Sequence, residues 1–131
     1  MTAFVDASVF VAIIGVEADE RAQAERIRDA TDLITSPMAI WEAITALVRR
    51  YRHTPETARN EVMASIEAAM IRIVSIGATE GDLALDAYAR FGKGRHRAGL
   101  NMGDCFAYAC ARANSAGLLY KGDDFTHTDL A

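Results

Sequence analysis

Short strand-like runs alternate with longer helical segments along the whole chain, and this alternation restricts the fold more than any other feature. The strand-like runs lie at residues 3–5, 32–35, 71–76 and 118–120. Strands separated by helices form a mainly parallel sheet, because each helical crossover returns the chain to the same end of the sheet. We therefore predict an α/β sandwich, in which the working site lies at the carboxyl ends of the strands.

Capping residues mark where the helices begin. Ser36, Thr54 and Asn101 are suited to N-cap positions, and Thr79 with Asp82 three residues later resembles a capping box. The predicted helices cover residues 8–15, 19–30, 37–51, 79–91 and 102–116, with a further helix from residue 55 that carries Val62, Ile66 and Met70 on one face.

Charge and composition restrict the compartment and the ligands. The formal net charge is −4, so a nuclease would need a metal ion and local basic patches to bind its substrate. The longest apolar run, residues 9–14, is far shorter than the roughly 20 residues of a membrane span, and we see no signal peptide. Cys105 and Cys110 point to different faces of a predicted helix, which favours free thiols in a reducing cytoplasm.

Acidic residues fall at places that one fold would bring together. Asp6 directly follows the first strand, and Asp123 and Asp124 follow the last one. Asp104 lies in the first turn of the helix before that last strand, and Glu42 lies in the helix after the second strand. In a parallel α/β sheet these positions converge on one edge.

Each of these acids also has an ordinary structural explanation. Asp104 suits a helix cap, Asp6 a turn at a strand end, and Glu42 a solvated helix surface. Asp123 and Asp124 suit a simple turn. The case for a site therefore rests on the combination of the acids and not on any one of them.

Clustered carboxylates repel one another unless a cation lies between them. Mg²⁺ and Mn²⁺ prefer oxygen ligands, keep several waters and activate water for attack on phosphate. His53, His96 and His127 are isolated along the sequence, so the spacing typical of a zinc site is missing. The pattern therefore predicts a magnesium or manganese site.

Four segments resemble the PIN-domain family, and more narrowly the VapC-type toxins. They are FVDAS at 4–8, WEA at 41–43, GKGRHRAGLNMGDCFAY at 92–108 and LLYKGDDF at 118–125. The resemblance covers the whole chain, and the last two segments are the specific ones. It implies a single PIN domain over residues 1–131, folded as a three-layer sandwich with four to five strands.

The resemblance also implies a function. VapC-type toxins are endoribonucleases that hold Mg²⁺ or Mn²⁺ in an acidic quartet, are usually dimeric and are inhibited by a cognate VapB-type antitoxin. Carried over, Asp6 and Asp104 are the principal metal ligands, Glu42 is a ligand or supporting acid, and Asp123 completes the quartet, with Asp124 as the open alternative. Ser8 is expected to bond a metal-bound water or a phosphate.

A glycine-rich basic loop precedes Asp104. Lys93, Arg95 and Arg97 are expected to contact the RNA backbone and to offset the negative net charge locally. Arg49, Arg50 and Arg52 form a second basic patch, although Arg49 and Arg50 also suit the end of a helix.

Other functional classes compete with this interpretation. A response-regulator receiver would need paired acids after the first strand and an acid after the third, and a haloacid-dehalogenase-type phosphatase would need Asp-x-Asp where residues 6–8 read DAS. The serious alternative is a catalytically weak PIN-like module that binds RNA or protein.

Overall fold

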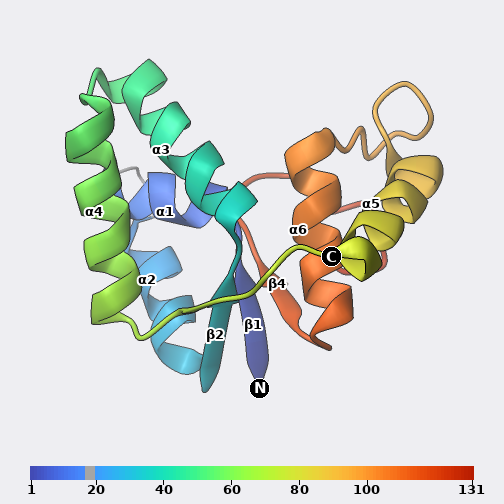
Figure 1. Ribbon diagram of the computed structural model, residues 1–131, viewed down its shortest axis with the longest axis horizontal. Coiled ribbons are helices and arrows are strands. Elements are labelled where there is room, and N and C mark those ends of the chain that lie inside the picture. Colours follow the sequence, from blue (N-terminus) through green and yellow to red (C-terminus); the bar gives the residue numbers. More distant parts are fainter. Residues whose placement is uncertain (17–19) are drawn as a thin grey trace.

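A parallel sheet in the order β3-β2-β1-β4 forms the centre of the computed structural model, which describes residues 1–16 and 20–131 (Figure 1). The strands of this described part are β1 (Thr2–Val5), β2 (Asp32–Thr35), β3 (Arg72–Ile73) and β4 (Gly117–Leu119). In the central strand, Phe4 is in register with Ile34 on one side and with Leu118 on the other. The parallel sheet expected from the sequence is confirmed.

Helices cover both faces of the sheet. They are α1 (Ala7–Ile14), α2 (Glu20–Asp29), α3 (Pro37–Tyr51), α4 (Pro55–Ala68), α5 (Ala78–Phe91) and α6 (Met102–Ala113). In Figure 1, α3 and α4 lie on one side of the sheet, and α5 and α6 lie on the other. The predicted helix start at Asp19 lies outside the described residues.

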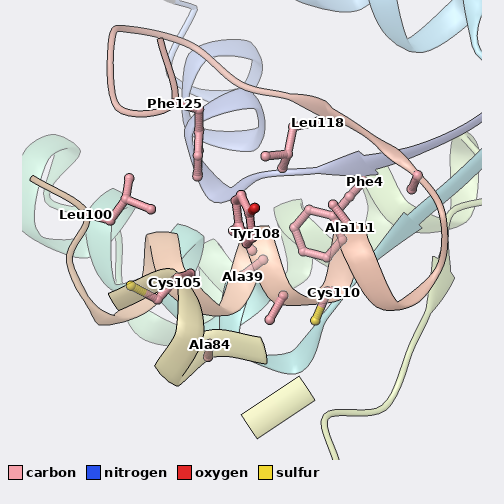
Figure 2. Close-up of a cluster of buried hydrophobic side chains, with 14 of the residues drawn as sticks. Phe4, Ala39, Ala84, Leu100, Cys105, Tyr108, Cys110, Ala111, Leu118 and Phe125 are labelled. Carbon is pink, nitrogen blue, oxygen red and sulfur yellow. The ribbon is translucent and has the colours of Figure 1, made fainter. Parts of the chain in front are cut away.

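Two hydrophobic clusters hold these layers together, and alternate residues of β1 belong to different clusters. Phe4 packs with Tyr108 and Leu118 in the cluster beneath α5 and α6 (Figure 2). Ala3 and Val5 belong to the cluster beneath α1, α3 and α4. This alternation follows from the two-residue period of a strand, and burial on both faces explains why β1 is wholly apolar at positions 3–5.

Three of the predicted N-caps are confirmed, and one is wrong. Ser36, Thr54 and Asn101 each accept a hydrogen bond from the backbone of the third residue that follows. The capping box predicted from Thr79 and Asp82 does not form, because α5 begins one residue before Thr79. Gly77 is the N-cap, and the Glu80 carboxylate accepts its N–H at 2.8 Å.

Some element ends also differ from the prediction. The third strand lies within residues 71–76, as expected, but is limited to Arg72–Ile73, since it lies at the sheet edge and pairs only with β2. Met70 was expected on the buried face of α4, but the helix ends at Ala68 and Met70 is 84% exposed, with a left-handed φ of 52°. The last helix ends at Ala113 and not at Ala116, and Ser115 just beyond it is left-handed.

Cys105 and Cys110 are free and buried, as expected. None of the helices in residues 1–16 and 20–131 has both the length and the hydropathy that crossing a bilayer requires.

Candidate active site

The strand order places a crevice beside the carboxyl end of β1. The chain moves from β1 through β2 to β3 on one side, and α5 and α6 then carry it to β4 on the other side. Ligands of open α/β sheets bind at such a switch point. A pocket of about 390 Å³ lies there, and its polar lining consists of Asp6, Ser8, Glu42, Arg49, Arg50, Asn101, Asp104, Lys121 and Asp124.

Asp6 joins the ends of β1 and β4 at the base of this pocket. Its backbone N–H donates to the Leu119 carbonyl at 3.0 Å, and its side chain caps α1 by accepting the Ser8 N–H at 3.1 Å. The Ser8 hydroxyl donates to Asp6 Oδ2 at 2.6 Å and accepts the Lys121 N–H at 2.9 Å. The hydroxyl proton of Ser8 therefore orients Asp6, and the contact of Ser8 with a metal-bound water or a phosphate stays a prediction.

Asp104 combines the two roles that the sequence left open. It forms a reciprocal cap with Asn101: the Asp104 N–H donates to Asn101 Oδ1 at 2.8 Å, and the Asn101 N–H donates to Asp104 Oδ2 at 3.1 Å. Asp104 is 8% exposed and also lines the pocket. The cap thus fixes the carboxylate at the pocket wall.

Glu42 reaches the pocket from α3 because residue 103 has no side chain. A Cβ built on Gly103 would overlap the carboxylate of Glu42. Sequence reasoning missed this glycine, although its position directly before Asp104 in the buried first turn of α6 was a usable signal.

Burial and mutual repulsion make these acids hard to ionise. Burial, with the charges of Asp6, Asp104 and Asp124, raises the pKa of Glu42 to about 7. Burial, with the charges of Asp124 and Asp6, raises the pKa of Asp104 to about 7 as well. The pKa of Asp6 is also raised, mainly by burial. Such a cluster has a strong electrostatic affinity for a cation.

The fourth acid at the pocket is Asp124. Its charge acts on Asp6, Glu42 and Asp104, and it lines the pocket. Asp123, the residue expected to complete the quartet, is not among the lining residues, although it is exposed as Asp124 is. The placement therefore favours the alternative that the sequence left open.

A family model matches residues 3–130 of the chain as a PIN domain. The chain belongs to the PIN-domain family. This PIN domain is 42% identical to a VapC ribonuclease of Rhizobium meliloti (strain 1021), over 97% of this chain and 98% of that protein. It is 40% identical to ribonuclease VapC30 of Mycobacterium tuberculosis, over 97% of this chain and 95% of that one. The VapC resemblance seen in the sequence is confirmed.

Solved structures share the fold of this PIN domain. VapC20 of Mycobacterium tuberculosis, a sarcin-ricin loop cleaving toxin, matches with a TM-score of 0.79 at 20% identity, covering 98% of this chain and 96% of that one. VapBC2 from Rickettsia felis, bound to a DNA fragment from their promoter, matches with a TM-score of 0.69 at 13% identity, covering 98% and 94%. At these identities the likeness shows the fold alone, and the expected PIN-like sandwich is confirmed.

The basic residues relevant to substrate binding lie in two separate places. Arg49, Arg50 and Lys121 line the acidic pocket, and Lys121 was missed as a site residue because it stands alone in the sequence. The predicted RNA-contacting residues Lys93, Arg95 and Arg97 are exposed on the loop after α5 and do not line that pocket. The Arg95 guanidinium lies 5.7 Å from the ring centre of Tyr88.

The acid cluster is better suited to a hard cation that keeps several waters than to one enclosed entirely by protein ligands. In the described part of the PIN domain, no three His, Cys, Asp or Glu side chains already stand at metal-binding distances from one another. Mg²⁺ commonly takes only one or two carboxylates and fills its octahedron with water and phosphate oxygens. Four carboxylates line the pocket, and the raised pKa values of Asp6, Glu42 and Asp104 show the need for a counter-charge, which suits that mode of binding.

Proposed function

We propose that this PIN domain is a Mg²⁺- or Mn²⁺-dependent endoribonuclease, and the toxin of a VapBC-type toxin–antitoxin module. The observation that carries the proposal is the convergence of Asp6, Glu42, Asp104 and Asp124 on one pocket at the switch point of the sheet. Relatives at 34–42% identity that bear the name VapC ribonuclease support it.

The four acids are the proposed metal-holding residues. Asp6 and Asp104 would be the principal ligands, because a helix cap fixes each of them. Asp6 caps α1 by accepting the Ser8 N–H, and Asp104 forms the reciprocal cap with Asn101 at the start of α6. Glu42 and Asp124 complete the quartet. A bound divalent cation would neutralise charge on the phosphate and lower the pKa of water, which is the chemistry that phosphodiester hydrolysis needs.

The remaining polar groups of the pocket orient the acids and the substrate. Ser8 holds Asp6 in place through its hydroxyl. Arg49, Arg50 and Lys121 lie where they would meet phosphate oxygens beside the scissile bond. Lys93, Arg95 and Arg97 would contact the RNA backbone farther along, and the open pocket suits single-stranded or looped RNA.

The proposed partners follow from the same comparison. Toxin–antitoxin complexes from Klebsiella pneumoniae and Rickettsia felis share the fold, which supports a cognate VapB-type antitoxin for this chain. We also propose a homodimer and a cytoplasmic location.

A manganese titration separates the nuclease from a PIN-like binding module. Free Mn²⁺ is measured by electron paramagnetic resonance as antitoxin-free protein is added, for the parent and for Asp6→Asn, and the same samples receive single-stranded RNA. A nuclease binds Mn²⁺ in the parent, binds it weakly in the variant, and cuts the RNA. A module that retains RNA without turnover and ignores Mn²⁺ would contradict the proposal.

A further inference from the structure

The segment after β4 carries Asp124 to the pocket without any helix or strand to support it. Residues 121–130 form only turns and bends. Gly122 has a φ of +90°, a conformation that turns the chain sharply after Lys121. The position of Asp124 therefore depends on side-chain contacts that hold this segment, hereafter the C-terminal segment.

One of these contacts is a buried aromatic side chain directly after Asp124. Phe125 is fully buried (Figure 2). Its ring packs edge-on against that of Tyr120, with ring centres 5.0 Å apart. Thr128 folds back on it, since its N–H and its hydroxyl donate to the Phe125 carbonyl at 3.1 and 2.8 Å. This closed turn links the backbone of Asp124 to the residues around Asp129.

The other contact is a network of three side chains around Asp129. The Tyr108 hydroxyl donates to Asp129 Oδ1 at 2.6 Å. Arg90 and Arg112 donate to Oδ2 at 3.2 and 2.5 Å. Arg90 belongs to the end of α5, whereas Tyr108 and Arg112 belong to α6. Asp129 thus fastens the C-terminal segment to both helices of one layer.

We propose that Asp129 is a positioning residue, which holds the C-terminal segment so that Asp124 faces the acidic pocket. This inference rests on the proposed function, because it concerns the metal-holding role of Asp124. Asp129 itself does not line the pocket and does not contact the substrate site. Its effect reaches the site through the turn at Phe125 and Thr128.

The chain offers a closely matched control. The Asp32 carboxylate receives two hydrogen bonds from Arg72, and its side chain is 39% exposed, the same value as for Asp129. The Asp32 pair joins β2 to β3, away from the C-terminal segment. Asp129→Asn and Asp32→Asn therefore each neutralise an arginine-paired carboxylate of the same exposure, and only the first should affect the site.

The experiment measures Mn²⁺ binding by electron paramagnetic resonance and amide hydrogen exchange over residues 122–131. We expect Asp129→Asn to weaken Mn²⁺ binding about tenfold, a typical effect for residues that orient ligands, and to accelerate exchange in the segment. Tyr108→Phe removes only the hydroxyl that donates to Asp129, and it should also weaken Mn²⁺ binding and accelerate exchange. Asp129→Glu should recover part of the loss, and Asp32→Asn should change neither measurement.

A double variant tests whether Asp129 acts through Asp124. In the Asp124→Asn background, Asp129→Asn should cause no further loss of Mn²⁺ affinity, because the carboxylate that it positions is already gone. An equal loss in both backgrounds would overturn the inference, as would faster exchange with unchanged Mn²⁺ binding. If the parent itself bound no Mn²⁺, the proposed function would fail first, so the two failures are distinguishable.

Discussion

The carboxylate of Glu42 occupies the space that a side chain at Gly103 would need. The two residues belong to different helices, α3 and α6, and Gly103 immediately precedes the pocket residue Asp104. The missing side chain at residue 103 therefore lets two acids of the proposed quartet come together.

Gly103→Ala should impair the site more than the fold. Alanine normally stabilises a helix by about 1 kcal/mol relative to glycine. The overlapping group is the end of a flexible side chain, so Glu42 can rotate away, and we expect the free energy of unfolding to change by less than about 1 kcal/mol. Displacing Glu42 should nevertheless weaken Mn²⁺ binding about tenfold.

The matched control for this substitution is Gly81→Ala in α5. No atom lies within 4 Å of a Cβ built on Gly81, so this variant gains helix propensity without a clash. Its Tm should rise slightly and its Mn²⁺ binding should be unchanged. Equal Mn²⁺ binding by Gly103→Ala and the parent would show that Glu42 does not contribute to the site.

Ser8→Ala should lower both stability and cleavage. The substitution removes the 2.6 Å bond to Asp6 and the acceptor of the Lys121 N–H. We expect a loss of about 1–2 kcal/mol in the free energy of unfolding, measured by urea denaturation. RNA cleavage should fall about tenfold because Asp6 loses its orientation. Ser8→Thr, which keeps the hydroxyl, should retain most of the activity, and a fully active Ser8→Ala would contradict the assigned role.

The sequence predicted the features of the fold that depend on local pattern. β2 begins and ends at the predicted residues, and Asn101 caps α6 as expected. The hydrophobic repeat of two residues in strands and of 3.6 residues in helices, together with capping residues, suffices to predict these features. The start of α5 was missed because two acids near it, Glu80 and Asp82, both suit a capping role, and only Glu80 is spaced correctly from Gly77.

The sequence could not decide between Asp123 and Asp124. Both follow the same strand, and which one faces the pocket depends on the backbone turn at Gly122 and on the burial of Phe125. Neither property follows from the periodicity of the preceding strand. The contact between Glu42 and Gly103 likewise depends on how two helices meet, which sequence spacing does not show.

Adjacent substitutions test this placement. Asp124→Asn should weaken Mn²⁺ binding and reduce RNA cleavage by at least about tenfold, since it removes a charge that acts on the three other acids. Asp123→Asn changes the net charge equally but lies outside the pocket, so its cleavage rate should remain close to that of the parent. The reverse order of effects would restore Asp123 as the fourth acid.

Stability of the metal-free protein should fall as the pH rises. The pKa of Glu42 and that of Asp104 are raised from 4.5 and 3.8 to about 7 in the folded state. At pH values between the ordinary pKa of each acid and about 7, the folded state binds more protons than the unfolded state, so the free energy of unfolding decreases as the pH rises. We expect a decrease of about 1–2 kcal/mol per group, because solvent screens part of the interaction. Thermal unfolding in EDTA should therefore give a lower Tm near pH 8 than near pH 5.

Metal and a neutral variant provide the controls for that pH dependence. Mg²⁺ should raise the Tm more near pH 8 than near pH 5, because it binds the ionised acids. Glu42→Gln cannot ionise at this position and should flatten the decline. A pH dependence that Glu42→Gln leaves unchanged would mean that other groups cause it.

Cleavage of a mixed RNA pool by purified, antitoxin-free protein tests the central claim most directly. Asp104→Asn is the decisive variant, since an amide oxygen still accepts the Asn101 N–H and preserves the cap while the charge is lost. We predict cutting by the parent with Mg²⁺ or Mn²⁺, none in EDTA, and a loss of orders of magnitude in Asp104→Asn with the fold intact. Intact RNA with every metal while the parent stays folded, or cutting by Asp104→Asn at the parent's rate, would contradict the account.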